Sequence, residues 1–199
     1  VANTTGPKNT AVGAQALQAN TTGNVNTAIG FKALYTNTTG DRNTAVGNGA
    51  LLTHNVTDDS DTYNTAVGHH ALNLLTTGHN NTALGATALE NSTTTVRSTA
   101  VGYGALQANT TGGYHTAIGY YALKANTTAS NNTAVGYKSM EANTTGIENT
   151  AFGDHALQNN TTANQNTAIG IDALQSNTTG AFQTAVGAWA LTSATTGSH

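Results

Sequence analysis

The feature that most constrains the fold is a 17-residue repeat. Pentads of the form Asn-Thr-Ala-Val-Gly, or close variants, begin at residues 9, 26, 43, 64, 81, 98, 115, 132, 149, 166 and 183. Every step is 17 residues except that from 43 to 64, which is 21 and locates a four-residue insertion within residues 55–63. A half-coil over residues 1–8, the eleven repeats and the insertion account for all 199 residues. We therefore expect a single repeat domain over residues 1–199.

The repeat unit predicts an all-β fold. Numbered from its pentad, it reads N-T-A-[VI]-G-x-x-A-L-x-x-N-T-T-G-x-x. Helical repeats need roughly 30 residues per unit and are not rich in Thr, Asn and Gly. The unit fits one coil of a parallel β-solenoid of about eleven 17-residue coils. We expect Thr-Ala-Val-Gly to form one strand, Ala-Leu-x-x a second, and Asn-Thr-Thr-Gly a turn. At about 4.8 Å per coil, the rod is roughly 55 Å long.

Positions 4 and 9 carry the large apolar side chains, and we expect both to line the core. Side chains alternate along a strand, so an inward position 4 directs Thr at position 2 inward, and Ala and Gly at positions 3 and 5 outward. The expected core ladder comprises Val12, Ile29, Val46, Val67, Leu84, Val101, Ile118, Val135, Phe152, Ile169 and Val186 with Leu17, Leu34, Leu51, Leu72, Leu89, Leu106, Leu123, Met140, Leu157, Leu174 and Leu191.

Ala at position 3 and Gly at position 5 do not vary among the eleven repeats. A face that merely contacts water would tolerate larger polar residues. We interpret the two positions as a packing face against another chain or another wall of the same coil. The alternative is the opposite phase of the strand, in which Ala and Gly fill a tight interior.

The two ends of the sequence favour self-association. Residues 1–8 already match positions 10–17, and the last repeat reaches position 17 at His199. Monomeric solenoids normally carry distinct polar caps that cover the terminal strand edges. We therefore expect copies of the chain to stack head to tail as a filament. The alternative is that the sequence is an excerpt from a longer repeat protein.

Composition argues against several classes of function. Only 8% of the residues are charged, the formal net charge is -3, and no run of Lys or Arg suggests a nucleic-acid partner. No apolar stretch approaches the roughly 18 residues of a membrane helix, so we expect no membrane insertion. No catalytic set or metal constellation stands out from the repeat, and Asp58, Asp59 and Asp61 are better explained as a solvated loop than as a calcium site. We expect no enzyme, metal or cofactor.

Position 12 supplies a recurring glycosylation sequon, Asn-x-Ser/Thr. The candidate acceptors at this position are Asn3, Asn20, Asn37, Asn109, Asn126, Asn143, Asn160 and Asn177, and Asn55 and Asn91, which stand beside position 12 in their repeats, satisfy the same rule. The alternative is that Asn and Thr form stacked turn ladders, with side-chain amides bonded from coil to coil. In that case the sequons carry no glycan.

A row of tyrosines is the second candidate surface. Tyr103, Tyr120 and Tyr137 occupy position 6 of three successive repeats and should form a ladder. Exposed stacked Tyr is suited to binding carbohydrate or a protein partner. Simple stacking stabilisation is the alternative.

The pentads at residues 26–30 and 166–170, both Asn-Thr-Ala-Ile-Gly, resemble the N-S-V-A-I-G type repeats in the head domains of trimeric autotransporter adhesins. The full unit also resembles repeats of phage and bacterial tail-fibre-like proteins. The resemblance implies a left-handed parallel β-roll that assembles as a trimer and binds host matrix or cells.

These observations give three hypotheses of function. The first is a structural subunit of an extracellular or cell-surface fibre, glycosylated and stacked end to end with copies of itself. The alternative is an adhesin or tail-fibre segment that binds glycans or a host surface. A minor alternative is an ice-binding solenoid, against which the expected inward orientation of the Thr at position 2 argues.

Overall fold

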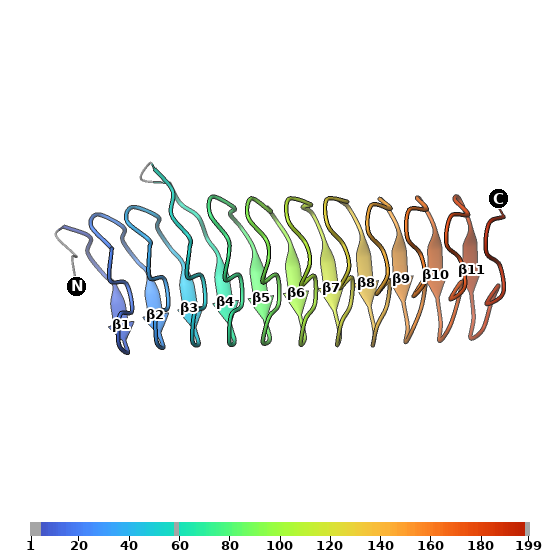
Figure 1. Ribbon diagram of the computed structural model, residues 1–199, viewed down its shortest axis with the longest axis horizontal. Coiled ribbons are helices and arrows are strands. Elements are labelled where there is room, and N and C mark those ends of the chain that lie inside the picture. The colour runs from blue at the N-terminus through green and yellow to red at the C-terminus, as the bar shows by residue number, and fades with distance from the viewer. Residues whose placement is uncertain (1–4, 58–59, 198–199) are drawn as a thin grey trace.

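The computed structural model describes residues 5–57 and 60–197 as one row of stacked coils (Figure 1). In these residues all the regular structure is β, with one three-residue strand per coil: β1 (Thr10–Val12), β2 (Thr27–Ile29), β3 (Thr44–Val46), β4 (Thr65–Val67), β5 (Thr82–Leu84), β6 (Thr99–Val101), β7 (Thr116–Ile118), β8 (Thr133–Val135), β9 (Thr150–Phe152), β10 (Thr167–Ile169) and β11 (Thr184–Val186). The strands pair in chain order as one parallel sheet. The prediction of a parallel β-solenoid with a 17-residue period is confirmed.

Backbone hydrogen bonds join each coil to both neighbours. The Thr27 N–H donates to the Asn43 carbonyl one coil ahead, at 2.8 Å, and the Gly30 N–H donates to the Val12 carbonyl one coil back, also at 2.8 Å. Each strand pairs with the same position of the next repeat, so Thr faces Thr and Ala faces Ala along the sheet. A strict 17-residue period is needed to keep this register, because a shift of one residue would reverse every side chain.

The prediction of a second strand over Ala-Leu-x-x is wrong. This segment is a turn, and the residue at position 9 has a left-handed backbone in every coil, with φ between 49° at Leu17 and 55° at Leu106. A branch at Cβ is strongly disfavoured in that conformation. This explains why position 9 holds Leu or Met and never Val or Ile, whereas the strand position 4 holds mostly Val and Ile.

The predicted phase of the strand is also wrong. The Ala side chains at position 3 point inward, and from Ala28 to Ala185 they are at most 3% exposed. The position-4 side chains point outward instead of lining the core: Val12, Ile29, Leu84, Ile118, Phe152, Ile169 and Val186 are 39 to 67% exposed, and Val46, Val67, Val101 and Val135 are half-buried. The alternative phase, with alanine in a tight interior, is the correct one.

The physical reason is the small cross-section of the coil. The wall opposite the strand already fills the interior with Ala at position 8 and Leu at position 9, so only a methyl group fits at position 3. The position-9 half of the predicted core is confirmed from Leu17 to Leu174, where every side chain is at most 2% exposed, and Leu191 in the last described coil is 52% exposed.

Gly at position 5 is required by contact between coils, not by contact with another chain. Gly102 has φ +126°, and a Cβ added to it would lie 2.5 Å from the carbonyl oxygen of Gly119. Both the backbone conformation and the space exclude a side chain. The strip of Ala and Gly is therefore internal to one chain.

Two columns of asparagine complete the interior. At position 1, the Asn26 Nδ2 donates to the Gly40 carbonyl at 2.8 Å, and the Asn26 Oδ1 accepts the Asn43 N–H at 2.9 Å. At position 12, the Asn143 Nδ2 donates to the Gly146 carbonyl at 3.0 Å and to the Oδ1 of Asn126 at 3.1 Å. These amides satisfy turn carbonyls that water does not reach. They form the turn ladders that the sequence offered as the alternative to glycosylation.

The insertion protrudes from the row of coils between β3 and β4 (Figure 1). The chain returns to the stack at Thr62, whose hydroxyl oxygen lies within hydrogen-bond distance, 2.8 Å, of both the Asp41 carbonyl oxygen and the Asn43 Oδ1. Arg42 forms an ion pair with Asp61 at the base of the protrusion. Asp58 and Asp59 lie outside the described residues.

Candidate functional site

The outer surface of the sheet is the most extensive candidate site. We call it the Thr/aliphatic face, and it consists of the side chains of positions 2 and 4 along β1–β11. These strands lie side by side along the rod (Figure 1). The Thr at position 2 is half-buried or exposed in every coil. None of the side chains at these two positions is charged. The face is thus a regular column of hydroxyls beside a regular column of large apolar groups.

The apolar column on this face is unusual for a solvated surface. Ile29 and Ile118 are each 39% exposed, Leu84 is 47% and Phe152 is 57%. Soluble monomers rarely expose contiguous apolar patches larger than a few hundred Å², and larger ones mark interaction sites. Sequence reasoning placed these residues in the core and so missed the face. The signal that could have found it is the tolerance of position 4 for Phe152, which is too large for a coil of constant width.

The structure places most of the glycosylation candidates in the interior. Asn20, Asn37, Asn109, Asn126, Asn143, Asn160 and Asn177 are fully buried. Their Nδ2 atoms, which a glycan would occupy, face the interior hydrogen-bond ladder, so glycosylation of these seven residues is incompatible with the fold. Asn55 and Asn91 are exposed. Asn3 lies outside the described residues.

The tyrosine ladder forms as the spacing predicts. The rings of Tyr103 and Tyr120 stack at a centroid distance of 5.5 Å, and those of Tyr120 and Tyr137 at 5.4 Å. Tyr121 joins them at 4.2 Å from Tyr120, and the Tyr120 hydroxyl is the main cause that raises the pKa of Tyr121 to about 12. His155 packs edge-on against Tyr137. The rings cover one another's faces and leave edges in solvent, so little aromatic face remains for a sugar ring.

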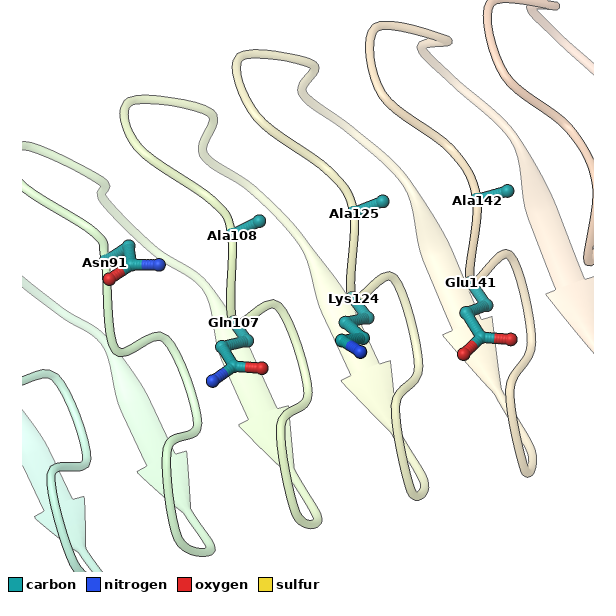
Figure 2. A pocket seen from close by; sticks show the side chains of 7 residues that line it. All are labelled: Asn91, Gln107, Ala108, Lys124, Ala125, Glu141 and Ala142. Carbon is teal, nitrogen blue, oxygen red and sulfur yellow. The ribbon is translucent and has the colours of Figure 1, made fainter.

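A shallow groove of about 440 Å³ runs along the turn after position 9 in four successive coils (Figure 2). Its lining consists of Asn91, Gln107, Ala108, Lys124, Ala125, Glu141 and Ala142. Figure 2 shows alanine methyls in one row and the Gln107, Lys124 and Glu141 side chains in another. Lys124 lies over the Tyr121 ring at 3.9 Å, and Glu141 pairs with Lys138 at 3.4 Å. Both charged groups of the lining, Lys124 and Glu141, therefore already have partners within the chain.

Residues 5–57 and 60–197 hold no group of three or more His, Cys, Asp or Glu side chains arranged to bind a metal ion. The same residues include no helix of the length and apolarity that a membrane span requires.

The fold and its surfaces define a 17-residue-period parallel β-solenoid. Searches of protein-family models, of curated proteins and of solved structures found no match to this chain.

Proposed function

We propose that the protein is a non-enzymatic structural rod of an extracellular or cell-surface fibre, and that it assembles with copies of itself through the Thr/aliphatic face. The observation that carries the proposal is the column of aliphatic side chains that stands outside the core along the whole row of strands. Removal of such side chains from water stabilises an assembly by about 25 cal/mol per Å² of apolar surface.

A second copy of the chain is the partner that fits this face best. The side chains of the Thr/aliphatic face repeat from coil to coil at the inter-strand spacing of roughly 4.8 Å, so two aligned copies remain in register over their whole length. The face carries no charge at positions 2 and 4, so two copies meet without repulsion or desolvation of ions. The resemblance of the pentads to adhesin-head repeats, which assemble as trimers, also supports side-by-side assembly of copies of the chain.

Assembly along the rod axis is the second part of the proposal. Each junction between coils uses the same set of contacts, for example Leu34 N–H to Ala50 carbonyl at 3.0 Å and Leu123 N–H to Ser139 carbonyl at 3.0 Å. A coil of one copy can therefore continue the stack of another with the contacts already used within the chain. Glycans on Asn55 and Asn91, the exposed sequons, would lie away from the interior ladder.

The test compares two substitutions with matched exposure. Ile118 on the Thr/aliphatic face is 39% exposed, and Ile147, in the turn before β9, is 38% exposed. We expect sedimentation velocity to show a wild-type oligomer, Ile118→Lys to shift it to the monomer, and Ile147→Lys to leave it unchanged. Electron microscopy over a concentration series then separates discrete bundles from filaments. A wild-type chain that stays monomeric at high concentration contradicts the proposal.

A specific observation also favours ice binding as a second candidate. The Thr at position 2 faces outward, not inward, so the argument against this function no longer holds. Hydroxyls and methyls in regular ranks on an uncharged sheet can hold water in an ordered layer. Thermal hysteresis measured on the wild type, on Thr116→Lys and on the turn control Thr145→Lys separates the two functions. A monomer with hysteresis that only Thr116→Lys abolishes would replace the fibre proposal.

A further inference from the structure

Four tyrosines meet at one place on the rod, and Tyr120 lies at the centre of the group. Tyr120 contacts Tyr103, Tyr121 and Tyr137 with ring centroids 5.5, 4.2 and 5.4 Å away. Tyr103 and Tyr121 are also in contact, at 5.4 Å. The tyrosines come from three successive coils, since Tyr103, Tyr120 and Tyr137 are 17 residues apart.

The cluster is accessible to a reagent in solution. Tyr103, Tyr120 and Tyr137 are 46%, 42% and 44% exposed. Their rings are nearly parallel, with interplanar angles of 15° for the first pair and 11° for the second. Each ring therefore presents its edge to solvent and its face to the ring of the next coil.

From this juxtaposition we infer that the tyrosine cluster is a site of oxidative cross-linking, at which a one-electron oxidant such as a haem peroxidase with hydrogen peroxide joins neighbouring coils by a dityrosine bond. Two phenols each lose one electron and one proton and become phenoxyl radicals. The radicals form a carbon–carbon bond between ring carbons ortho to oxygen, and the two hydrogens on those carbons move to the oxygens. The peroxide accepts both electrons and both protons and is reduced to two waters.

Proximity selects the pair that couples. A radical formed on any of the four rings has a neighbouring ring in contact, so coupling within the chain precedes an encounter between chains. A bond between Tyr120 and Tyr137 or between Tyr103 and Tyr120 closes a loop of about one coil, and such a cross-link restricts the unfolded chain more than the folded one. The bond would covalently join coils that are otherwise held by hydrogen bonds and packing. This inference does not depend on the proposed self-assembly.

The experiment uses the full chain at low concentration with a haem peroxidase and hydrogen peroxide. We expect dityrosine fluorescence in a product of monomer mass less two hydrogens. Trypsin cleaves after Lys124, so a bond between Tyr120 and Tyr137 joins two tryptic peptides that are otherwise separate. Tyr120→Phe keeps a ring in the stack but leaves only one of the four contacts between two tyrosines. This variant should lower the yield of dityrosine several-fold.

The matched control is Tyr114→Phe. Tyr114 is 50% exposed, and its ring contacts no other tyrosine among the described residues. Its hydroxyl accepts a hydrogen bond from Arg97 at 2.8 Å instead. This variant should form the cross-link at the wild-type yield. Three results would overturn the inference: product of dimer mass only, cross-links at tyrosines outside the cluster, or an equal yield from Tyr120→Phe and wild type.

Discussion

The position-12 column behaves differently in two parts of the rod. In the coils of β6 to β10 it is a continuous asparagine ladder, in which Asn126 donates to Asn109 at 2.9 Å and Asn160 donates to Asn143 at 2.8 Å. Beside the insertion, the same position holds His54, Leu75 and Ser92 in three successive coils, and the ladder is interrupted. We call these three coils the interrupted segment.

The interrupted segment shows which replacements a buried ladder tolerates. Leu75 is fully buried and brings no polar atom that needs a partner. His54 is also fully buried, and neither of its ring nitrogens forms a hydrogen bond of normal geometry, the Thr76 backbone being its one weak polar contact. The Oδ1 of Asn37 one coil below also lacks a partner. A buried polar group without a partner costs about 1–3 kcal/mol, whereas an apolar replacement of similar shape can be nearly neutral. The weak point of the interrupted segment is therefore His54.

His115 is the informative contrast, because it replaces asparagine in the position-1 column without loss of pairing. Its Nε2 lies 2.7 Å from the Ala129 carbonyl, where an asparagine Nδ2 would donate. Its Nδ1 accepts the Asn132 N–H at 3.3 Å, where an asparagine Oδ1 would accept. The two nitrogens of neutral imidazole thus reproduce the donor and acceptor of the amide.

The largest expected effect is acid destabilisation through His54. Burial lowers its pKa from 6.5 to about 4, and the nearby Thr76 backbone opposes part of the shift. Above pH 6.5 the residue is neutral in both folded and unfolded chains. Between pH 6.5 and about 4 the unfolded chain binds a proton that the folded chain does not, so the free energy of unfolding falls, by about 3 kcal/mol in total. Urea unfolding at a series of pH values measures this loss.

The comparison within this experiment is His54→Asn. This variant should lose about 3 kcal/mol less stability than wild type between pH 7 and pH 4. Some acid sensitivity should remain, because burial also lowers the pKa of His115. Equal pH profiles for wild type and His54→Asn would show that the interrupted segment does not govern the response to acid.

The next effect in size is an interruption introduced into the continuous ladder. Asn143→Leu leaves the Asn126 Oδ1 without its donor and removes the acceptor of the Asn160 Nδ2. We expect a loss of about 2 kcal/mol in the free energy of unfolding, read from the urea midpoint by circular dichroism. The control is Asn159→Leu, the same change at an exposed side chain, which should cost less than about 0.5 kcal/mol. Similar losses in both variants would mean that the ladder contributes little.

The period of the sequence was enough to predict the coils, the place of the insertion and the inward Leu at position 9. It did not reveal the phase of the strand, because positions 3 and 4 are both apolar and alternation allows either to point inward. The deciding quantity is the interior width, which the opposite wall sets. The clue was available in the size of the residues: position 3 is always Ala, whereas position 4 varies from Val12 to Phe152.

The same limit applies to the candidate sites. The Asn-Thr-Thr motif satisfies the glycosylation sequon and also builds a buried ladder, and only the direction of the Asn side chain separates the two. Leu75 at an asparagine position was a signal that this position is interior. The tyrosine ladder was predictable because equal spacing brings position-6 side chains together whichever way the strand faces.

The smallest effect, and the sharpest test of the contrast between the two histidines, is at neutral pH. His54→Asn removes two poorly paired ring nitrogens and supplies a donor for the Asn37 Oδ1, so we expect a gain of about 1 kcal/mol in the free energy of unfolding at pH 8. His115→Asn should change it by less than about 0.5 kcal/mol, since the residue is already paired on both nitrogens. Urea midpoints of the two variants and wild type decide the point. If His115→Asn raised the free energy of unfolding as much as His54→Asn does, the gain would come from the loss of imidazole bulk in a narrow coil and not from repair of the ladder.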